Sequence, residues 1–319
     1  MELCTLVKDQ AKQLRLVAQR RERAPCRSDC LRPSVGGTAP RVIAVTSGKG
    51  GVGKTSMSTN LAILLAQRRH RVLVFDADLG LANVDVLLGL HPTQTLQHVL
   101  YGECTLADVL MTGPNNIRIV PGASGMVELA NLDDAPRSAL VEQLGQLGDE
   151  ADVVMVDTSP GVSRNVIGFA VAADEVIVVT TPEPTAMTDA YAVIKVIARE
   201  NVHSRIRLLV NMVRDEREAN EVTDRMRLVA QQFLHVEVEP IGFVPHDRHV
   251  ALAVHQRHPF VLSYPRSLAA QSLQKVAGRL DGDAPLEAPR YRAENSRFQT
   301  FLERVSAAMK RRKETPHHG

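Results

Sequence analysis

Two kinds of hydrophobic pattern alternate along the middle of the chain. Short runs rich in Val, Ile and Leu, such as RVIAVTS, RVLVFD, DVVMVD and EVIVVTT, are separated by longer segments in which apolar residues recur every three or four positions. The short runs predict strands buried on both faces, and the longer segments predict amphipathic helices. The alternation predicts an α/β domain over residues 41–281, with a mainly parallel sheet flanked by helices on both faces.

Both ends of the chain carry a further amphipathic pattern, set apart from this domain by polar sequence. Residues 1–18 form one apolar stripe at helical spacing, and residues 19–40, basic and rich in Pro, Gly and Ser, predict a flexible linker. Residues 282–295 predict a second linker, and residues 296–313 predict a basic amphipathic helix. Its apolar face consists of Phe298, Phe301, Leu302, Val305 and Met309.

The pattern of residues 296–313 predicts binding to a membrane surface. Its apolar side chains are bulky, and the Lys and Arg residues at its end would attract anionic lipid by roughly 1 kcal/mol each. The alternative is that the helix packs back on the domain. Because no run reaches the roughly 18 apolar residues of a membrane span and the start lacks a signal-peptide layout, we expect a cytoplasmic protein. It would associate peripherally with the inner face of the cytoplasmic membrane.

Composition argues against a nucleic-acid partner. The formal net charge is only +2, aromatic residues make up 3% of the chain, and tryptophan is absent. A small net charge gives no general attraction to phosphate backbones, and few aromatic rings leave no platform on which bases could stack. We therefore expect no direct binding of nucleic acid.

The stretch SGKGGVGKTS, Ser47–Ser56, carries the strongest chemical signal. It satisfies the phosphate-binding pattern G-x-x-x-x-G-K-[ST], and it lies between a predicted strand and a predicted helix, as the pattern requires. Backbone N–H groups and the helix N-terminus would cradle the phosphates, with Lys54 reaching the β- and γ-phosphates. The predicted nucleotide-binding residues of the loop are Gly48, Lys49, Gly50, Gly51, Val52, Gly53, Lys54, Thr55 and Ser56.

Hydrolysis of a nucleoside triphosphate also needs Mg²⁺ and a group that orients the attacking water. The Thr55 hydroxyl and the Asp157 carboxylate, at the end of DVVMVD, are the predicted metal ligands. Asp78 follows the strand RVLVFD; it is predicted to position the water and is the third predicted residue of the metal site. Asp76 ends the same strand, and its alternative role is to cap the following turn.

Lys49 is surplus to an ordinary phosphate-binding loop. The form KGGVGKTS resembles the deviant Walker A motif of the MinD/ParA ATPases, DADLGLANVD resembles their switch I, and DTSPG resembles their switch II. This resemblance extends from Arg41 to about Leu280. It implies a P-loop ATPase that uses ATP and Mg²⁺ and is activated by dimerisation.

The resemblance also implies roles for individual residues. Lys49 would reach across an ATP-dependent dimer interface to the partner's phosphates, where its charge stabilises the transferring phosphoryl group. Lys54 would serve its own subunit, Asp78 would align the water, and Asp157 would belong to the magnesium shell. The remaining implied contacts are the Gly161 amide with the γ-phosphate, and Asn211 with the backbone around Pro245 and Asp247 for the adenine. Pro160 departs from the usual switch II, and its fixed φ would slow movement of that loop.

The N-terminal stretch DQAKQLR resembles the DQAxxLR motif of the FlhG/FleN family, MinD-like regulators of flagellar number. That resemblance implies binding and stimulation of the FlhF GTPase, and restraint of a FleQ-type transcription activator. Flagellar basal-body components and the cell pole are further implied associations. The implied partner-binding residues are Asp9, Gln10, Ala11, Leu14 and Arg15. The alternative is that this helix covers an edge of the same molecule.

Other functions stay open at this point. A MinD/ParA-type ATPase that positions another cargo, at the division site or during chromosome partitioning, would share the same core. A protein that acts mainly by binding partners, with ATP as a timer, is a second alternative. An iron–sulfur carrier of the same superfamily needs paired cysteines late in the domain, and no cysteine follows Cys104.

Overall fold

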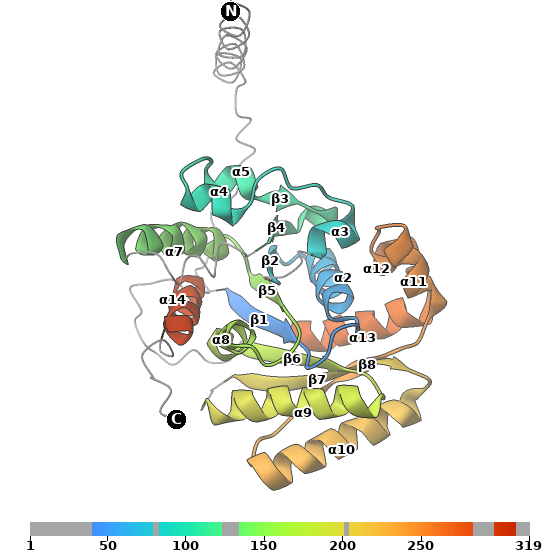
Figure 1. Cartoon of the computed structure of the whole chain (residues 1–319). Coiled ribbons are helices and arrows are strands. Elements are labelled where there is room, and N and C mark those ends of the chain that lie inside the picture. The colour runs from blue at the N-terminus through green and yellow to red at the C-terminus, as the bar shows by residue number, and fades with distance from the viewer. Residues whose placement is uncertain (1–39, 79–82, 123–133, 201–203, 283–296, 311–319) are drawn as a thin grey trace, which may run out of the picture. The chain divides into compact units, whose positions relative to one another are not determined.

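One sheet of eight strands organises the part of the chain that the computed structural model describes, residues 40–78, 83–122, 134–200, 204–282 and 297–310 (Figure 1). The strand order is β3-β4-β2-β5-β1-β6-β7-β8. All neighbouring pairs are parallel except β3 and β4, so the predicted α/β class with a mainly parallel sheet is confirmed. The strands are β1 (Arg41–Thr46), β2 (Val72–Ala77), β3 (Met111–Thr112), β4 (Arg118–Val120), β5 (Val153–Thr158), β6 (Glu175–Thr180), β7 (Arg205–Val213) and β8 (Glu239–Pro245).

Helices cover both faces of the sheet because successive strand residues point to opposite sides. Ile43 and Val45 of β1 belong to a core shared with α2 (Lys54–Gln67), α12 (Phe260–Ser263) and α13 (Leu268–Gly282). On the opposite face lie α7 (Asp134–Asp149), α8 (Arg164–Ala172), α9 (Pro184–Arg199), α10 (Glu216–Leu234) and α14 (Arg297–Lys310). The shorter elements are α3 (Val84–Leu88), α4 (Leu96–Leu100), α5 (Leu106–Val109), η1 (Pro114–Asn116) and α11 (Arg248–His255).

The register of the central strands determines where polar side chains meet. Val45 of β1 lies beside Asp157 of β5, and Asp76 of β2 lies on the other side of Asp157. The loops that leave β1, β2 and β5 therefore start at the same edge of the sheet. This carboxyl edge is where ligands bind in open parallel sheets.

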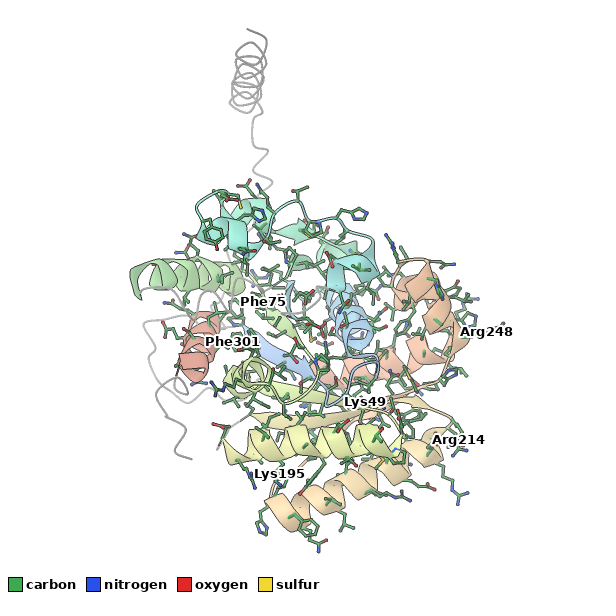
Figure 2. The ribbon with its side chains drawn as sticks, viewed as in Figure 1. Lys49, Phe75, Lys195, Arg214, Arg248 and Phe301 are labelled. Carbon is green, nitrogen blue, oxygen red and sulfur yellow. The ribbon has the colours of Figure 1, made fainter. Side chains whose placement is uncertain are left out.

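Helix α14 lies in a groove of the domain instead of projecting from it. Phe298, Phe301, Leu302 and Val305 are all at most 2% exposed, packed against α7 and α8. The Phe298 ring stacks on Phe301 at 5.5 Å and meets Phe75 of β2 edge-on at 6.3 Å. Figure 2 labels Phe75 and Phe301.

The sequence analysis gave two possibilities for this helix, binding to a membrane and packing on the domain, and the structure shows the second. The predicted membrane face is the face that the domain covers, because any apolar surface can satisfy such a stripe. Membrane contact by these four side chains is therefore excluded in this conformation and requires α14 to leave the groove. The side chain of Met309 and residues 311–313 lie outside the described part of the chain.

Two sequence predictions are not tested by this fold. The DQAxxLR segment, including Asp9, Gln10, Ala11, Leu14 and Arg15, lies outside the described residues, as do both predicted linkers apart from Pro40 and Gly282 at their edges. Among the described residues, none of the helices combines the length and the apolar character needed to cross a bilayer.

Candidate nucleotide site

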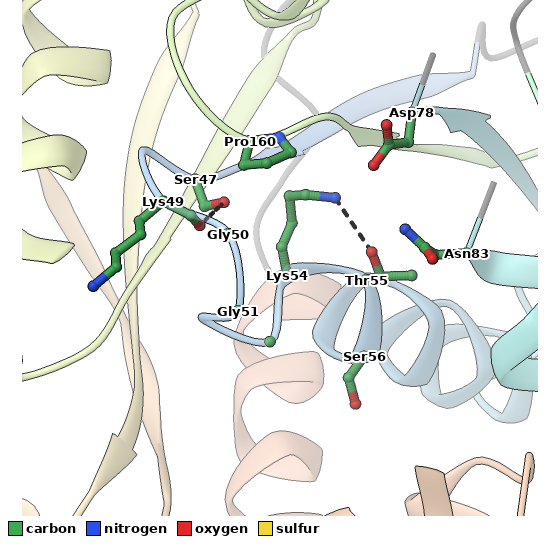
Figure 3. A pocket seen from close by; sticks show the side chains of 11 residues that line it. Ser47, Lys49, Gly50, Gly51, Lys54, Thr55, Ser56, Asp78, Asn83 and Pro160 are labelled. Atoms are coloured by element: carbon green, nitrogen blue, oxygen red, sulfur yellow. Dashed lines mark hydrogen bonds between the residues drawn. The ribbon is translucent and has the colours of Figure 1, made fainter. Parts of the chain in front are cut away.

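The phosphate-binding loop connects β1 to α2 and forms one wall of a pocket of about 500 Å³ (Figure 3). The strand ends at Thr46 and the helix starts at Lys54, so the backbone N–H groups at the start of α2 face the pocket without intrahelical partners. This is the arrangement expected for binding phosphate. The pocket is lined by Ser47, Lys49, Gly50, Gly51, Gly53, Lys54, Thr55, Ser56, Asp78, Asn83 and Pro160.

Two glycines are required by the path of the loop. A Cβ atom on Gly48 would lie 2.1 Å from the backbone of Asp189, at the start of α9. Gly53 has φ 87°, and a Cβ atom there would lie 2.4 Å from the Asn211 amide nitrogen. Close approach to the backbone of α9 explains Gly48, and the left-handed conformation explains Gly53.

Lys54 is buried at the centre of the site. Its Nζ atom lies 2.8 Å from Asp157 Oδ1 and 3.3 Å from Thr55 Oγ1. Lys54 and Asp157 are 7% and 0% exposed, so the ion pair lies in a region of low dielectric. A buried pair of this kind is costly unless its remaining polar atoms find partners.

The residues around Lys54 fit a magnesium ion. Among the described residues, Asp157 Oδ2 is buried without a hydrogen-bond partner, and Thr55 supplies a hydroxyl at the same edge of the pocket. Carboxylate and hydroxyl oxygens are the ligands that Mg²⁺ takes, usually together with water and substrate phosphates. The predicted ligands Thr55 and Asp157 are thus brought together, and Asp78 lines the same pocket.

Asp76 and Asp78 have different surroundings. Asp76 accepts hydrogen bonds from the backbone N–H groups of Asp78, Asn83 and Val84, at 3.1–3.3 Å, so it caps the turn after β2. Burial and the neighbouring Asp157 raise the pKa of Asp76 to about 7. Asp78 faces the pocket and accepts a hydrogen bond from the Ser159 hydroxyl at 2.7 Å. Asp76 therefore has the alternative role considered from the sequence, capping the turn after its strand.

Lys49 belongs to the pocket lining, but its side chain points away from the pocket of its own subunit. Its Nζ atom lies 2.7 Å from Glu183 Oε1 and 3.0 Å from Thr185 Oγ1, both at the start of α9. Figure 3 shows its side chain directed opposite to that of Lys54. The hydrogen bond and charge of Lys49 lower the pKa of Glu183. Because both side chains are well exposed, 38% and 55%, water screens this pair and little free energy opposes its exchange for another partner.

The residues predicted to contact adenine lie at the ends of β7 and β8. The Asn211 amide donates to Val52 O at 2.8 Å and so holds the phosphate loop. Asp247 accepts from the backbone N–H groups of His249 and Ala269, which caps α11 and steadies the start of α13. Both side chains thus have structural partners, and Pro245 ends β8 beside them. None of the three lines the phosphate pocket, and their adenine contacts stay a prediction.

Gly161 follows Pro160 in the loop after β5. Its backbone N–H donates to Ser47 O at 2.7 Å, which ties this loop to the phosphate-binding loop. Gly161 has φ 96°, a conformation suited to glycine. To meet a γ-phosphate, as the sequence resemblance implies, this N–H would have to exchange its present acceptor.

Sequence reasoning missed several residues of the site. Glu183 and Thr185 bind Lys49, Ser159 binds Asp78, and Asn83 lines the pocket. Ser159 belongs to DTSPG, directly after a predicted strand, so the sequence marks it as a residue at the sheet edge but not as a partner of Asp78. Glu183 and Thr185 stand directly after the strand EVIVVTT, at the same edge of the sheet.

A strand–loop–helix phosphate cradle, a buried lysine and magnesium-type oxygen ligands define a P-loop nucleoside triphosphatase. The profile of the AAA domain family matches residues 40–210. The chain is 44% identical over 241 residues to the antiactivator FleN of Pseudomonas aeruginosa, covering 76% of this chain and 86% of FleN. It is 35% identical to the flagellum site-determining protein YlxH of Helicobacter pylori, covering 75% and 81%.

Solved structures agree with this assignment. The cell division ATPase MinD of Pyrococcus furiosus superimposes with a TM-score of 0.61 at 26% identity, covering 76% of this chain and 98% of MinD. MinD of Pyrococcus horikoshii, solved with Mg-ADP, gives 0.61 at 27% identity, covering 76% and 96%. The chain belongs to the FlhG/FleN family of MinD/ParA ATPases, as the sequence motifs predicted.

Proposed function

We propose that the protein is an ATP-dependent dimerising switch that controls the number and placement of flagella. The main support for a dimer is the direction of the Lys49 side chain, which points away from its own phosphate pocket and pairs with the exposed Glu183 carboxylate. A cation held outward by a weak pair is available to the phosphates of a second subunit. There it would neutralise charge that develops on the transferring group.

Within each subunit, different side chains would bind the phosphates, bind the metal ion and orient the attacking water. Lys54 would hold the β- and γ-phosphates, and Thr55 and Asp157 would hold Mg²⁺, whose charge would neutralise that of the phosphates. Asp78 lines the pocket beside Thr55 and orients the attacking water. The reaction is therefore Mg²⁺-dependent hydrolysis of ATP to ADP and phosphate, completed by dimerisation.

The flagellar role is supported by the relatives at 44% and 35% identity, whose names refer to antiactivation and to determination of the flagellar site. The motif Asp9–Arg15 supports binding to the FlhF GTPase. The antiactivator relative supports restraint of a FleQ-type activator. The switch would act in the cytoplasm and at the inner face of the membrane, near the cell pole.

GTP hydrolysis by purified FlhF tests this proposal. A peptide spanning Met1–Arg20 is expected to stimulate FlhF, and the same peptide with Gln10→Ala is expected to lose the stimulation. The full chain and its Gln10→Ala variant provide the matched comparison. If neither peptide nor full chain stimulates FlhF, the flagellar assignment of partners is wrong, and a MinD/ParA ATPase with another cargo becomes the better description.

Membrane binding in this proposal depends on release of α14. In the groove its four large apolar residues are covered, whereas a lipid surface could cover the same face. Gly148 of α7 is essential to the docked position, because a Cβ atom there would lie 2.2 Å from the Phe298 ring. The docked helix and the membrane-bound helix are therefore mutually exclusive.

Gly148→Ala is expected to raise binding to anionic liposomes in the absence of nucleotide. Alanine favours the α7 helix by up to about 1 kcal/mol, but forcing a methyl group into this contact costs roughly 1–3 kcal/mol, so α14 is displaced. Co-sedimentation with phosphatidylglycerol vesicles measures the effect. Gly282→Ala, where an added Cβ meets none of the described residues within 4 Å, is the matched control. Unchanged sedimentation, or binding that survives truncation before Ser296, would contradict the role of α14.

A further inference from the structure

A side-chain hydrogen bond connects Asp78, directly after β2, with Ser159, directly after β5. The Ser159 hydroxyl donates to Asp78 Oδ1 at 2.7 Å. Bonds from a hydroxyl to a carboxylate at this distance belong to the charge-assisted class, which is roughly twice as strong as bonds between neutral groups. The bond therefore holds a carboxylate of the phosphate pocket in one orientation.

The register of the sheet brings these two residues together. Strands β2 and β5 are parallel neighbours in which Asp76 faces Asp157 and Ala77 faces Thr158. One step further along both chains places Asp78 beside Ser159. The contact thus follows from strand pairing in the rigid core and does not depend on a long loop.

The backbone around Ser159 is held on both sides. The Thr158 hydroxyl has two carbonyl acceptors within reach, Val45 O at 3.1 Å and Ser159 O at 3.0 Å, and the Gly161 N–H donates to Ser47 O. Pro160 further restricts the preceding residue to extended conformations. Ser159 therefore presents its hydroxyl from a nearly fixed backbone, in the loop whose next glycine is expected to meet the γ-phosphate.

We propose that Ser159 is a positioning residue for ATP hydrolysis. It orients Asp78, and it couples the position of Asp78 to the phosphate-sensing loop after β5. The hydroxyl keeps its proton throughout and does not touch the nucleotide. This inference rests on the proposed role of Asp78 in aligning the attacking water.

Steady-state ATP hydrolysis and ATP affinity of the full chain in Mg²⁺ test the inference. Ser159→Ala is expected to lower kcat about tenfold while KM and ATP affinity stay within about twofold, because the bond acts on the reacting geometry and not on phosphate binding. Ser159→Thr retains a hydroxyl and is expected to restore kcat to within about threefold of the wild type. Ser163→Ala is the matched control, since Ser163 is exposed and its side chain makes no capping bond to α8.

The outcomes separate this inference from the proposed function. Normal kcat in Ser159→Ala, faster hydrolysis, or a loss that threonine does not restore would overturn the positioning role. A rise in KM at constant kcat would instead assign Ser159 to ATP binding and would equally contradict it. If Asp78→Ala retains wild-type turnover, the proposed water alignment fails. If Asp78→Ala is inactive and Ser159→Ala is normal, only the role of Ser159 fails.

Discussion

Lys49→Ala is expected to abolish ATP-dependent dimerisation and to lower ATP turnover by at least about a thousandfold, the range found when a cation supplied in trans is removed. ATP affinity of the monomer is expected to change by less than about threefold, because Lys49 points away from its own phosphate pocket and Lys54 remains. Folding is expected to be unaffected, since the lost partner, Glu183, is well exposed. Light scattering after size exclusion, with and without ATP, reports the dimer, and phosphate release reports turnover.

Lys195→Ala is the matched control for Lys49→Ala. Lys195 is a lysine of α9, on a different part of the surface (Figure 2), and its loss leaves the phosphate loop and its neighbours intact. Wild-type turnover is expected. A Lys49→Ala protein that still dimerises and hydrolyses ATP at the normal rate would show that the outward lysine has no role across an interface.

Asp78→Ala is expected to trap the ATP-bound dimer. Hydrolysis falls by about 10²- to 10⁴-fold when the group that handles the attacking water is removed, whereas Lys54, Thr55 and Asp157 still hold the nucleotide and its metal. The dimer should therefore form with ATP and persist, with more protein on liposomes than in the wild type. Single-turnover hydrolysis and dimer lifetime after ATP removal measure the two effects.

Asp224→Ala, which removes an exposed aspartate of α10, controls for the loss of one negative charge. Turnover close to the wild type is expected there. Loss of ATP binding in Asp78→Ala would place Asp78 in nucleotide binding, and rapid dissociation of the dimer would argue that hydrolysis does not drive its release.

The phosphate loop and the magnesium-type ligands were predictable because their signals are local. Lys54 and Thr55 belong to one motif, and Asp157 ends a strand whose apolar run is unmistakable. Parallel strands deliver such residues to one edge of the sheet, so the sequence assigned Lys54 and Asp157 to one site; their contact at 2.8 Å also requires that β1 and β5 are neighbours. The fold class followed for the same reason.

The remaining parts of the site depend on pairings between distant segments. Ser159 meets Asp78 only because β2 neighbours β5, and Glu183 meets Lys49 only because β6 neighbours β1. Strand order is not encoded in any short stretch, so these contacts could not be predicted. The location of α14 was open for another reason, because an apolar stripe indicates that a face is covered but not what covers it.

Helix α14 can bury its apolar face either on the domain or in a membrane, and the charge of the lipid influences which of the two is favoured. Burying each of its four large apolar side chains contributes about 1.5–3 kcal/mol relative to water, in the groove or in a bilayer, so this contribution largely cancels on transfer. Smaller differences then decide the balance, among them roughly 1 kcal/mol for each Lys or Arg near an anionic surface. Helix α14 ends at Lys310, and Arg311, Arg312 and Lys313 follow it in the sequence. In the proposed switch, the anionic lipid content of the membrane therefore sets how much nucleotide-bound protein is retained there.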